Sequence, residues 1–140
     1  MIIVARDLSP AETTQMSKAQ VLGFITERGG KTSHTAIIAH SLEIPAVVGL
    51  DNATLEIESG DLIILDGITG VVILDPDDSL RRIYQARRAD FEIFKSEVVL
   101  GSAMAAVTSD GLPTRVMANI EMPEEVSLVF KYGADGVGLY

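Results

Sequence analysis

The chain has 140 residues, of which 47% are hydrophobic, and a formal net charge of −9. This composition supports a packed core and argues against disorder, and the acidic balance argues against a nucleic-acid partner, because phosphate binding needs clustered cations. Cysteine is absent, which excludes disulfides, thiol nucleophiles and cysteine-ligated metals. No apolar run approaches the roughly 20 residues that span a bilayer, and the N-terminus lacks a signal-peptide pattern. We therefore expect a cytoplasmic protein with no membrane segment.

The N-terminal residues predict a strand followed by a short helix. Residues 2–5 are an apolar run typical of a buried strand. Ser9, Pro10 and Glu12 then stand at the N-cap, first and third positions of a helix start. This helix is predicted to end near Met16.

The next elements alternate strand and helix and then form a hairpin. Residues 21–26 predict a buried strand, and apolar residues at helical spacing predict a helix over 33–42. A third strand is expected at 46–49. Turn residues between 62–66 and 71–74 predict an antiparallel hairpin that closes a β-rich layer.

From residue 77 onwards the pattern changes. Residues 77–99 predict a long charged helix with an incomplete apolar stripe, of a kind that connects domains. A second hairpin is expected over 105–120, around a turn of serine, aspartate and glycine. A helix over 123–132 and a strand over 136–140 then resemble the opening of another α/β domain.

The stretch from Gly29 to His34 combines an anion-binding turn with a nucleophile. Paired glycines let backbone amides approach a ligand, and a helix that begins near Ser33 presents unpaired N–H groups and a positive dipole end. Hydroxyl groups of Thr32 and Thr35 and the cation of Lys31 add to this. Because neutral histidine is well populated near pH 7, His34 can carry a phosphoryl group.

A structural interpretation of these residues stays open. A glycine pair often precedes a helix, Ser33 or Thr32 can simply be the N-cap, and His34 is in register with apolar helix positions. The pattern is not a P-loop. His34 and His40 are six residues apart, which does not place both on one helix face for metal ligation. His40 is expected to be an exposed helix residue.

The whole run from Gly29 to Gly49 closely resembles the phosphohistidine signature of the PEP-utilising enzymes. Within that group it is similar to enzyme I of the bacterial phosphoenolpyruvate:sugar phosphotransferase system. Pyruvate, phosphate dikinase and phosphoenolpyruvate synthase usually have alanine where this chain has Thr35, so enzyme I matches better. The segments 7–13, 117–120 and 133–140 agree with the same family.

The resemblance implies a phosphotransferase in which the histidine aligned with His34 accepts the phosphoryl group of phosphoenolpyruvate on Nε2 and passes it to a histidine of the carrier protein HPr. It places Thr13 where a threonine hydroxyl contacts the active histidine, although bonding within its own helix turn is an equal alternative. The positions implied to bind phosphate are Gly29, Gly30, Lys31, Thr32, Ser33 and Thr35. Lys31 and His40 stand where the family usually has arginine, so their roles stay open.

The resemblance also implies a domain plan within the α/β class. Residues 1–76 correspond to a β/β/α phosphohistidine swivelling domain without its most N-terminal strands, 77–100 to a linker helix, and 101–140 to the truncated start of a phosphoenolpyruvate-binding (β/α)8 barrel. The family's phosphoenolpyruvate and Mg²⁺ site lies in the rest of that barrel. We therefore expect no metal site in this chain and no self-phosphorylation.

The family further implies a full-length homodimer and a role in sugar transport or a nitrogen-regulatory branch. Two alternatives remain. One is the corresponding domain of a pyruvate, phosphate dikinase or phosphoenolpyruvate synthase, and the other is a non-catalytic interaction module on the same scaffold.

Overall fold

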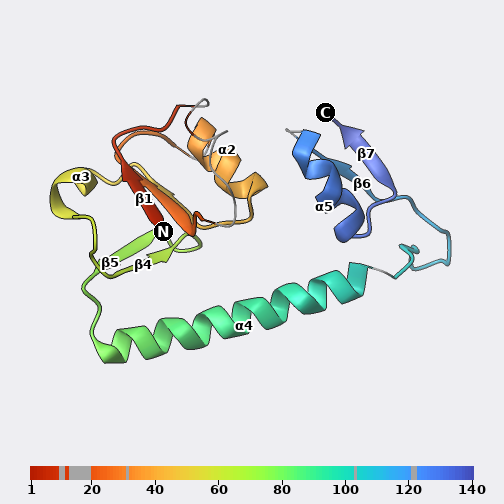
Figure 1. Ribbon diagram of the computed structural model, residues 1–140. Helices are drawn as coiled ribbons and strands as arrows, with labels where there is room; N and C mark the ends of the chain where they lie inside the picture. Colours follow the sequence, from red (N-terminus) through yellow and green to blue (C-terminus); the bar gives the residue numbers. More distant parts are fainter. Residues whose placement is uncertain (10–11, 13–19, 31, 103, 121–122) are drawn as a thin grey trace. The chain divides into compact units, whose positions relative to one another are not determined.

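The computed structural model describes residues 1–140 except 10–11, 13–19, 31, 103 and 121–122. The chain divides into two units, Met1–Arg82 and Ile83–Tyr140. Each unit mixes helices with a small sheet, as Figure 1 shows, so the predicted α/β class is confirmed. None of the helices described is long and apolar enough to cross a bilayer.

A parallel three-stranded sheet forms the centre of the first unit. Its order is β1 (Ile2–Ala5), β2 (Gly23–Thr26) and β3 (Ala46–Val48), with β2 in the middle. All four residues of β2 are buried, and Phe24 and Ile25 are completely excluded from solvent. A central parallel strand is covered on both faces, which is why this segment is a continuous apolar run.

Two helices follow the strands of this sheet. Helix α2 (His34–Ser41) connects β2 to β3 and packs on both, and its C-cap is Leu42. The predicted helix over 33–42 is therefore confirmed. The four-residue helix α3 (Ala53–Glu56) follows β3 and was not predicted, because a single turn is too short to show helical periodicity.

The predicted hairpin is confirmed and forms a second β layer. Strands β4 (Ile63–Asp66) and β5 (Val71–Leu74) pair antiparallel. The hairpin packs on the central strand so closely that a Cβ on Gly23 would lie 2.5 Å from Leu65 Cδ2. Figure 1 shows the hairpin and α2 on different sides of the parallel sheet.

The predicted helix start near the N-terminus has the geometry of a reciprocal cap. The Ser9 amide and hydroxyl donate to Glu12 Oε2 at 2.8 and 2.6 Å, and the Glu12 amide approaches Ser9 Oγ at 3.4 Å. These hydrogen bonds lower the pKa of Glu12. Pro10 and the predicted helix end at Met16 lie outside the described residues.

Helix α4 (Asp78–Ser102) matches the long helix predicted over 77–99 and extends three residues further. None of its residues is buried. After it come β6 (Met117–Asn119), a 3₁₀ turn with α5 (Val126–Lys131), and β7 (Gly136–Leu139). Strands β6 and β7 are parallel, so the predicted helix and final strand form a β–α–β arrangement.

The hairpin predicted over 105–120 is confirmed only around its turn and is wrong beyond it. Only Val107 and Pro113 form an isolated antiparallel bridge, and β6 pairs with β7 instead. The turn closes locally, because the Thr108 amide donates to the Leu112 carbonyl at 2.9 Å. On the other side of the bridge the Thr114 amide donates to the Ala106 carbonyl at 2.8 Å, and beyond it residues 117–119 pair with β7.

Candidate functional site

His34 is the first residue of α2, just beyond the carboxyl end of the central strand β2. In parallel α/β sheets ligands bind at this edge, where helix N-termini meet strand ends. The preceding residue, Ser33, has extended backbone angles and accepts a hydrogen bond on Oγ from the Ala36 amide at 3.3 Å. The helix start is therefore defined by a side-chain cap that leaves His34 in the first turn.

The turn before the helix depends on glycine at one of its two positions. Gly29 has a φ of 116°, and a Cβ there would lie 3.0 Å from Ser33 Oγ and 3.6 Å from Val48 Cβ. A Cβ on Gly30 would meet no atom of the described residues within 4 Å, and the Gly30 carbonyl accepts from the Ser33 amide at 2.9 Å. The first glycine is therefore needed for close packing of the turn, while the second lies in open space.

The imidazole of His34 is half-buried, and its Nε2 atom is shielded from solvent. Nε2 finds no hydrogen-bond partner among the residues that the structure describes. A buried polar atom without a partner costs about 1–3 kcal/mol. The unpaired Nε2 atom does not stabilise the fold, so its position at a helix start indicates a functional role.

The other predicted site residues lie in different environments. Thr32 is exposed beside the helix start, Ser33 is half-buried, and Thr35 is only 2% exposed. His40 is exposed, as predicted. The predicted contacts of Thr13 and Lys31 lie outside the described residues.

Glu27, at the end of β2, was not singled out from the sequence. Its Oε1 accepts from the Thr54 amide at 2.9 Å and the Thr54 hydroxyl at 2.5 Å, and its Oε2 lies 3.8 Å from Arg6 Nε. The hydrogen bonds from Thr54 are the main cause of its lowered pKa. The signal was missing because Thr54 lies 27 residues further along the chain.

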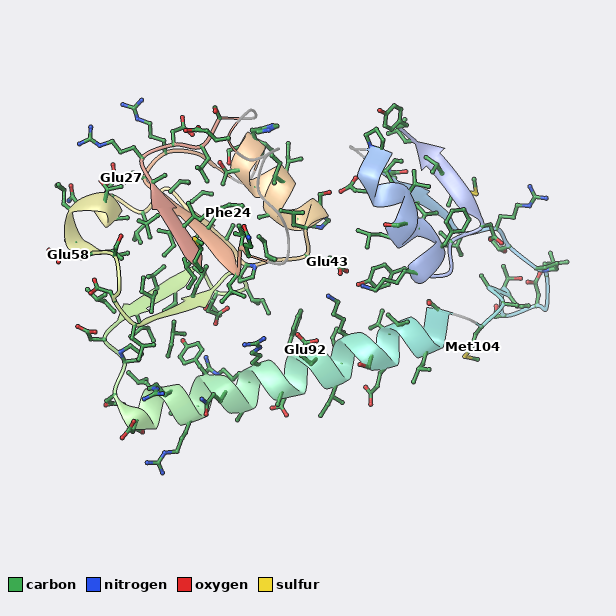
Figure 2. The ribbon with its side chains drawn as sticks, in the orientation of Figure 1. Phe24, Glu27, Glu43, Glu58, Glu92 and Met104 are labelled. Atoms are coloured by element: carbon green, nitrogen blue, oxygen red, sulfur yellow. The ribbon has the colours of Figure 1, made fainter. Side chains whose placement is uncertain are left out.

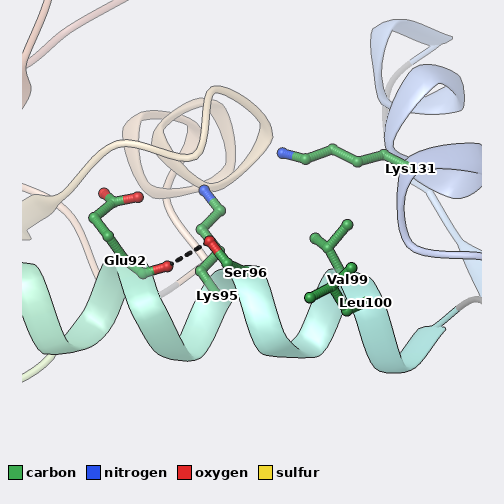
Figure 3. Close-up of a pocket in the computed structure, with 6 residues that line it drawn as sticks. All are labelled: Glu92, Lys95, Ser96, Val99, Leu100 and Lys131. Carbon is green, nitrogen blue, oxygen red and sulfur yellow. Dashed lines mark hydrogen bonds between the residues drawn. The ribbon is translucent and has the colours of Figure 1, made fainter.

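The described residues include no group of three or more histidine, aspartate or glutamate side chains that could hold a metal ion. The second unit carries an open depression of about 500 Å³ on α4 and α5, shown in Figure 3. Its lining residues are Glu92, Lys95, Ser96, Val99, Leu100 and Lys131. None of these was predicted to be a site residue, and His34 belongs to the other unit.

The fold and the site define an α/β domain that presents a histidine at the start of a helix, after a glycine turn at the edge of a parallel sheet. The model of the PEP-utilising enzyme mobile domain matches residues 1–70, and that of the PEP-utilising enzyme PEP-binding domain matches residues 95–140. The chain belongs to the PEP-utilising enzyme family.

The relatives of this chain support its assignment to enzyme I within this family. A phosphoenolpyruvate-protein phosphotransferase of Geobacillus stearothermophilus is 44% identical over 140 residues, which are 100% of this chain and 24% of the relative. The Staphylococcus epidermidis protein of the same name is 45% identical over 139 residues, 99% of this chain and 24% of its own. The chain thus spans about a quarter of the length of these relatives.

A solution structure of an enzyme I protein is similar in fold, with a TM-score of 0.62 and 52% sequence identity. The match covers 65% of this chain and 37% of that one. The predicted resemblance to enzyme I is therefore confirmed.

Proposed function

We propose that His34 carries a phosphoryl group from phosphoenolpyruvate to a histidine of the carrier protein HPr, as a part of a phosphoenolpyruvate-protein phosphotransferase. The observation that carries this proposal is the shielded Nε2 atom of His34, without a partner among the described residues, at the N-terminus of α2. The names of the relatives support the reaction class, and the family membership supports the donor.

In the proposed reaction the neutral imidazole attacks phosphorus through the Nε2 lone pair. An N–P bond forms as the bond between phosphorus and the enol oxygen breaks, and the departing enolate takes a proton to become pyruvate. In the second step the carrier's histidine attacks the same phosphorus, the N–P bond to His34 breaks, and His34 is neutral again. Transfers of this kind require positioning and charge stabilisation more than covalent help from the protein.

The helix start would stabilise the phosphohistidine. The first amides of a helix have no partners within it, and its dipole favours a nearby anion by about 0.3–1 kcal/mol, or up to about 2 kcal/mol where partly buried. Thr32 is exposed next to Ser33, and we propose that its hydroxyl donates to a phosphate oxygen. We assign Ser33 and Thr35 supporting roles, because the first caps the helix and the second is buried. Contacts from Thr13 and Lys31 remain part of the proposal.

The domain plan belongs to the same proposal: a swivelling domain at 1–76, a linker helix at 77–100 and the opening of a phosphoenolpyruvate-binding barrel at 101–140. A helix of 25 residues spans about 37 Å, which is long enough to separate two domains. The described residues include no carboxylate or histidine cluster that could hold the Mg²⁺ expected for the full enzyme. The phosphoryl-transfer steps above are therefore written without it. A homodimer, a sugar-transport role and a cytoplasmic location remain predictions.

The test is labelling of the protein, expressed from its natural reading frame, with [³²P]phosphoenolpyruvate, Mg²⁺ and HPr. We expect acid-labile, base-stable label on the protein and then on HPr. His34→Ala should abolish the label, and the matched control His40→Ala should retain it. Label on the His34→Ala protein would refute the assignment.

The 140 residues alone should stay unlabelled by phosphoenolpyruvate. Residues 95–140 contain two parallel strands and the helix between them, whereas a complete (β/α)8 barrel needs about 250 residues. Label appearing on this chain by itself would contradict the expected location of the donor site.

A further inference from the structure

The side chain of Glu27 connects residues from the segments that follow the three strands of the parallel sheet. Arg6 follows β1, Glu27 follows β2, and Thr54 lies in α3 after β3. The carboxylate accepts from both the amide and the hydroxyl of Thr54, and it lies 3.8 Å from the Arg6 guanidinium. Only 18% of the Glu27 side chain is exposed. Figure 2 shows it at the edge of the sheet beside α3.

Helix α3 uses this carboxylate in place of a cap of its own. Its N-cap residue, Asn52, has a left-handed φ of 61° and makes no side-chain capping bond. The Thr54 amide, in the first turn, donates to Glu27 instead. Because a helix of four residues has almost no intrinsic stability, an anion at its N-terminus from another strand matters for its placement.

The segment held by Glu27 packs against the glycine turn. The Leu50 amide donates to the Thr26 carbonyl at 3.0 Å, and a Cβ on Gly49 would lie 3.4 Å from the Gly29 carbonyl oxygen. On its other side Gly29 lies against Ser33, the cap of α2. Hydrogen bonds from Thr54 to Glu27 and from Leu50 to Thr26, with close approaches of the backbone at Gly49 and Gly29, therefore connect Glu27 to the helix start that holds His34.

We propose that Glu27 is a positioning residue of the phosphoryl-transfer site: by fixing Thr54 and the segment 49–54 behind the glycine turn, it sets the orientation of the His34 imidazole. This inference rests on the proposed function of His34. Glu27 touches neither the ring nor a substrate in this scheme, so it acts through the turn and not on the reacting atoms.

The variants separate the hydrogen bonds from the charge. Glu27→Gln keeps the shape but removes the anion, and Thr54→Val removes the hydroxyl donor while keeping the amide. Thr54→Ser keeps the hydroxyl and serves as the conservative rescue. Glu58→Gln changes net charge by the same amount at an exposed glutamate of the same unit and is the matched control (Figure 2).

The first measurement is the rate of His34 labelling by phosphoenolpyruvate in the natural protein. We expect kcat to fall by roughly tenfold for Glu27→Gln and Thr54→Val, since small misplacements of a reacting group are costly, with KM for phosphoenolpyruvate unchanged. Thr54→Ser and Glu58→Gln should match the unaltered protein. Equal kcat values in all variants would overturn the inference.

The second measurement is the ¹⁵N and ¹H spectrum of the His34 ring in the 140-residue chain, which does not depend on phosphoryl transfer. The ring signals should move in Glu27→Gln and Thr54→Val and return in Thr54→Ser, while those of His40 stay fixed. A loss of stability without movement of the ring signals would make Glu27 a structural residue only. If His34→Ala still accepts label, the proposed function fails, and that outcome is independent of the ring spectrum.

Discussion

Substitution of the two adjacent glycines in the turn before His34 should give very different results. At Gly29 the φ of 116° lies in a region that side chains with a Cβ rarely adopt, and an alanine there would cost about 1–3 kcal/mol in backbone strain. Its Cβ would also lie 3.0 Å from Ser33 Oγ, so the serine must move. Loss of the helix cap adds about 1 kcal/mol. The expected total for Gly29→Ala is about 2–4 kcal/mol.

Gly30→Ala is the matched control. Within the part of the chain that the structure describes, no atom lies within 4 Å of the position that its Cβ would take. The substitution also reduces the freedom of the unfolded chain, so we expect the free energy of unfolding to stay the same or rise by less than about 1 kcal/mol.

The assay is a urea titration followed by the amide signals of Phe24 and Ile25 in β2. These report on the first unit alone, which matters because the two units need not unfold together. The Gly29→Ala midpoint should lie well below that of Gly30→Ala. Equal midpoints would refute the argument that close packing of the turn, and not chain flexibility, requires the first glycine.

Further substitutions test the same unit, with one control, Ile93→Val, in the second unit. Ser33→Ala should lower its free energy of unfolding by about 0.5–2 kcal/mol and speed exchange of the Ala36 amide, and unchanged exchange would contradict the cap. Ile25→Val should cost about 0.5–1.5 kcal/mol, whereas Ile93→Val, on the exposed face of α4, should cost almost nothing. Because the pKa values of Glu12 and Glu27 are lowered on folding, their stabilisation is present above the unfolded value near 4.5 and is lost as pH falls through the folded value. Glu12→Gln and Glu27→Gln should therefore flatten the acid limb of stability against pH, and an unchanged limb would show that these hydrogen bonds are absent in solution.

Local signals in the sequence predicted most of the elements correctly. The reciprocal cap of Ser9 and Glu12, the helix over 33–42 and the hairpin of 62–66 and 71–74 depend on interactions between residues close in the chain. The second hairpin forms only around its predicted turn, because the partner of β6 is β7. Strand pairing is a long-range choice that a turn pattern cannot decide.

The glycine pair, the cap and the histidine at a helix start followed from the sequence by itself, because each is a property of a few neighbouring residues. Only the tertiary structure distinguished the two glycines, because the atoms that crowd Gly29 include Val48 from another strand. The tertiary structure also showed that His34 Nε2 is shielded from solvent and that Thr54 donates hydrogen bonds to Glu27. Burial and cross-strand hydrogen bonds arise when distant segments meet, so no spacing rule in a single sequence contains them.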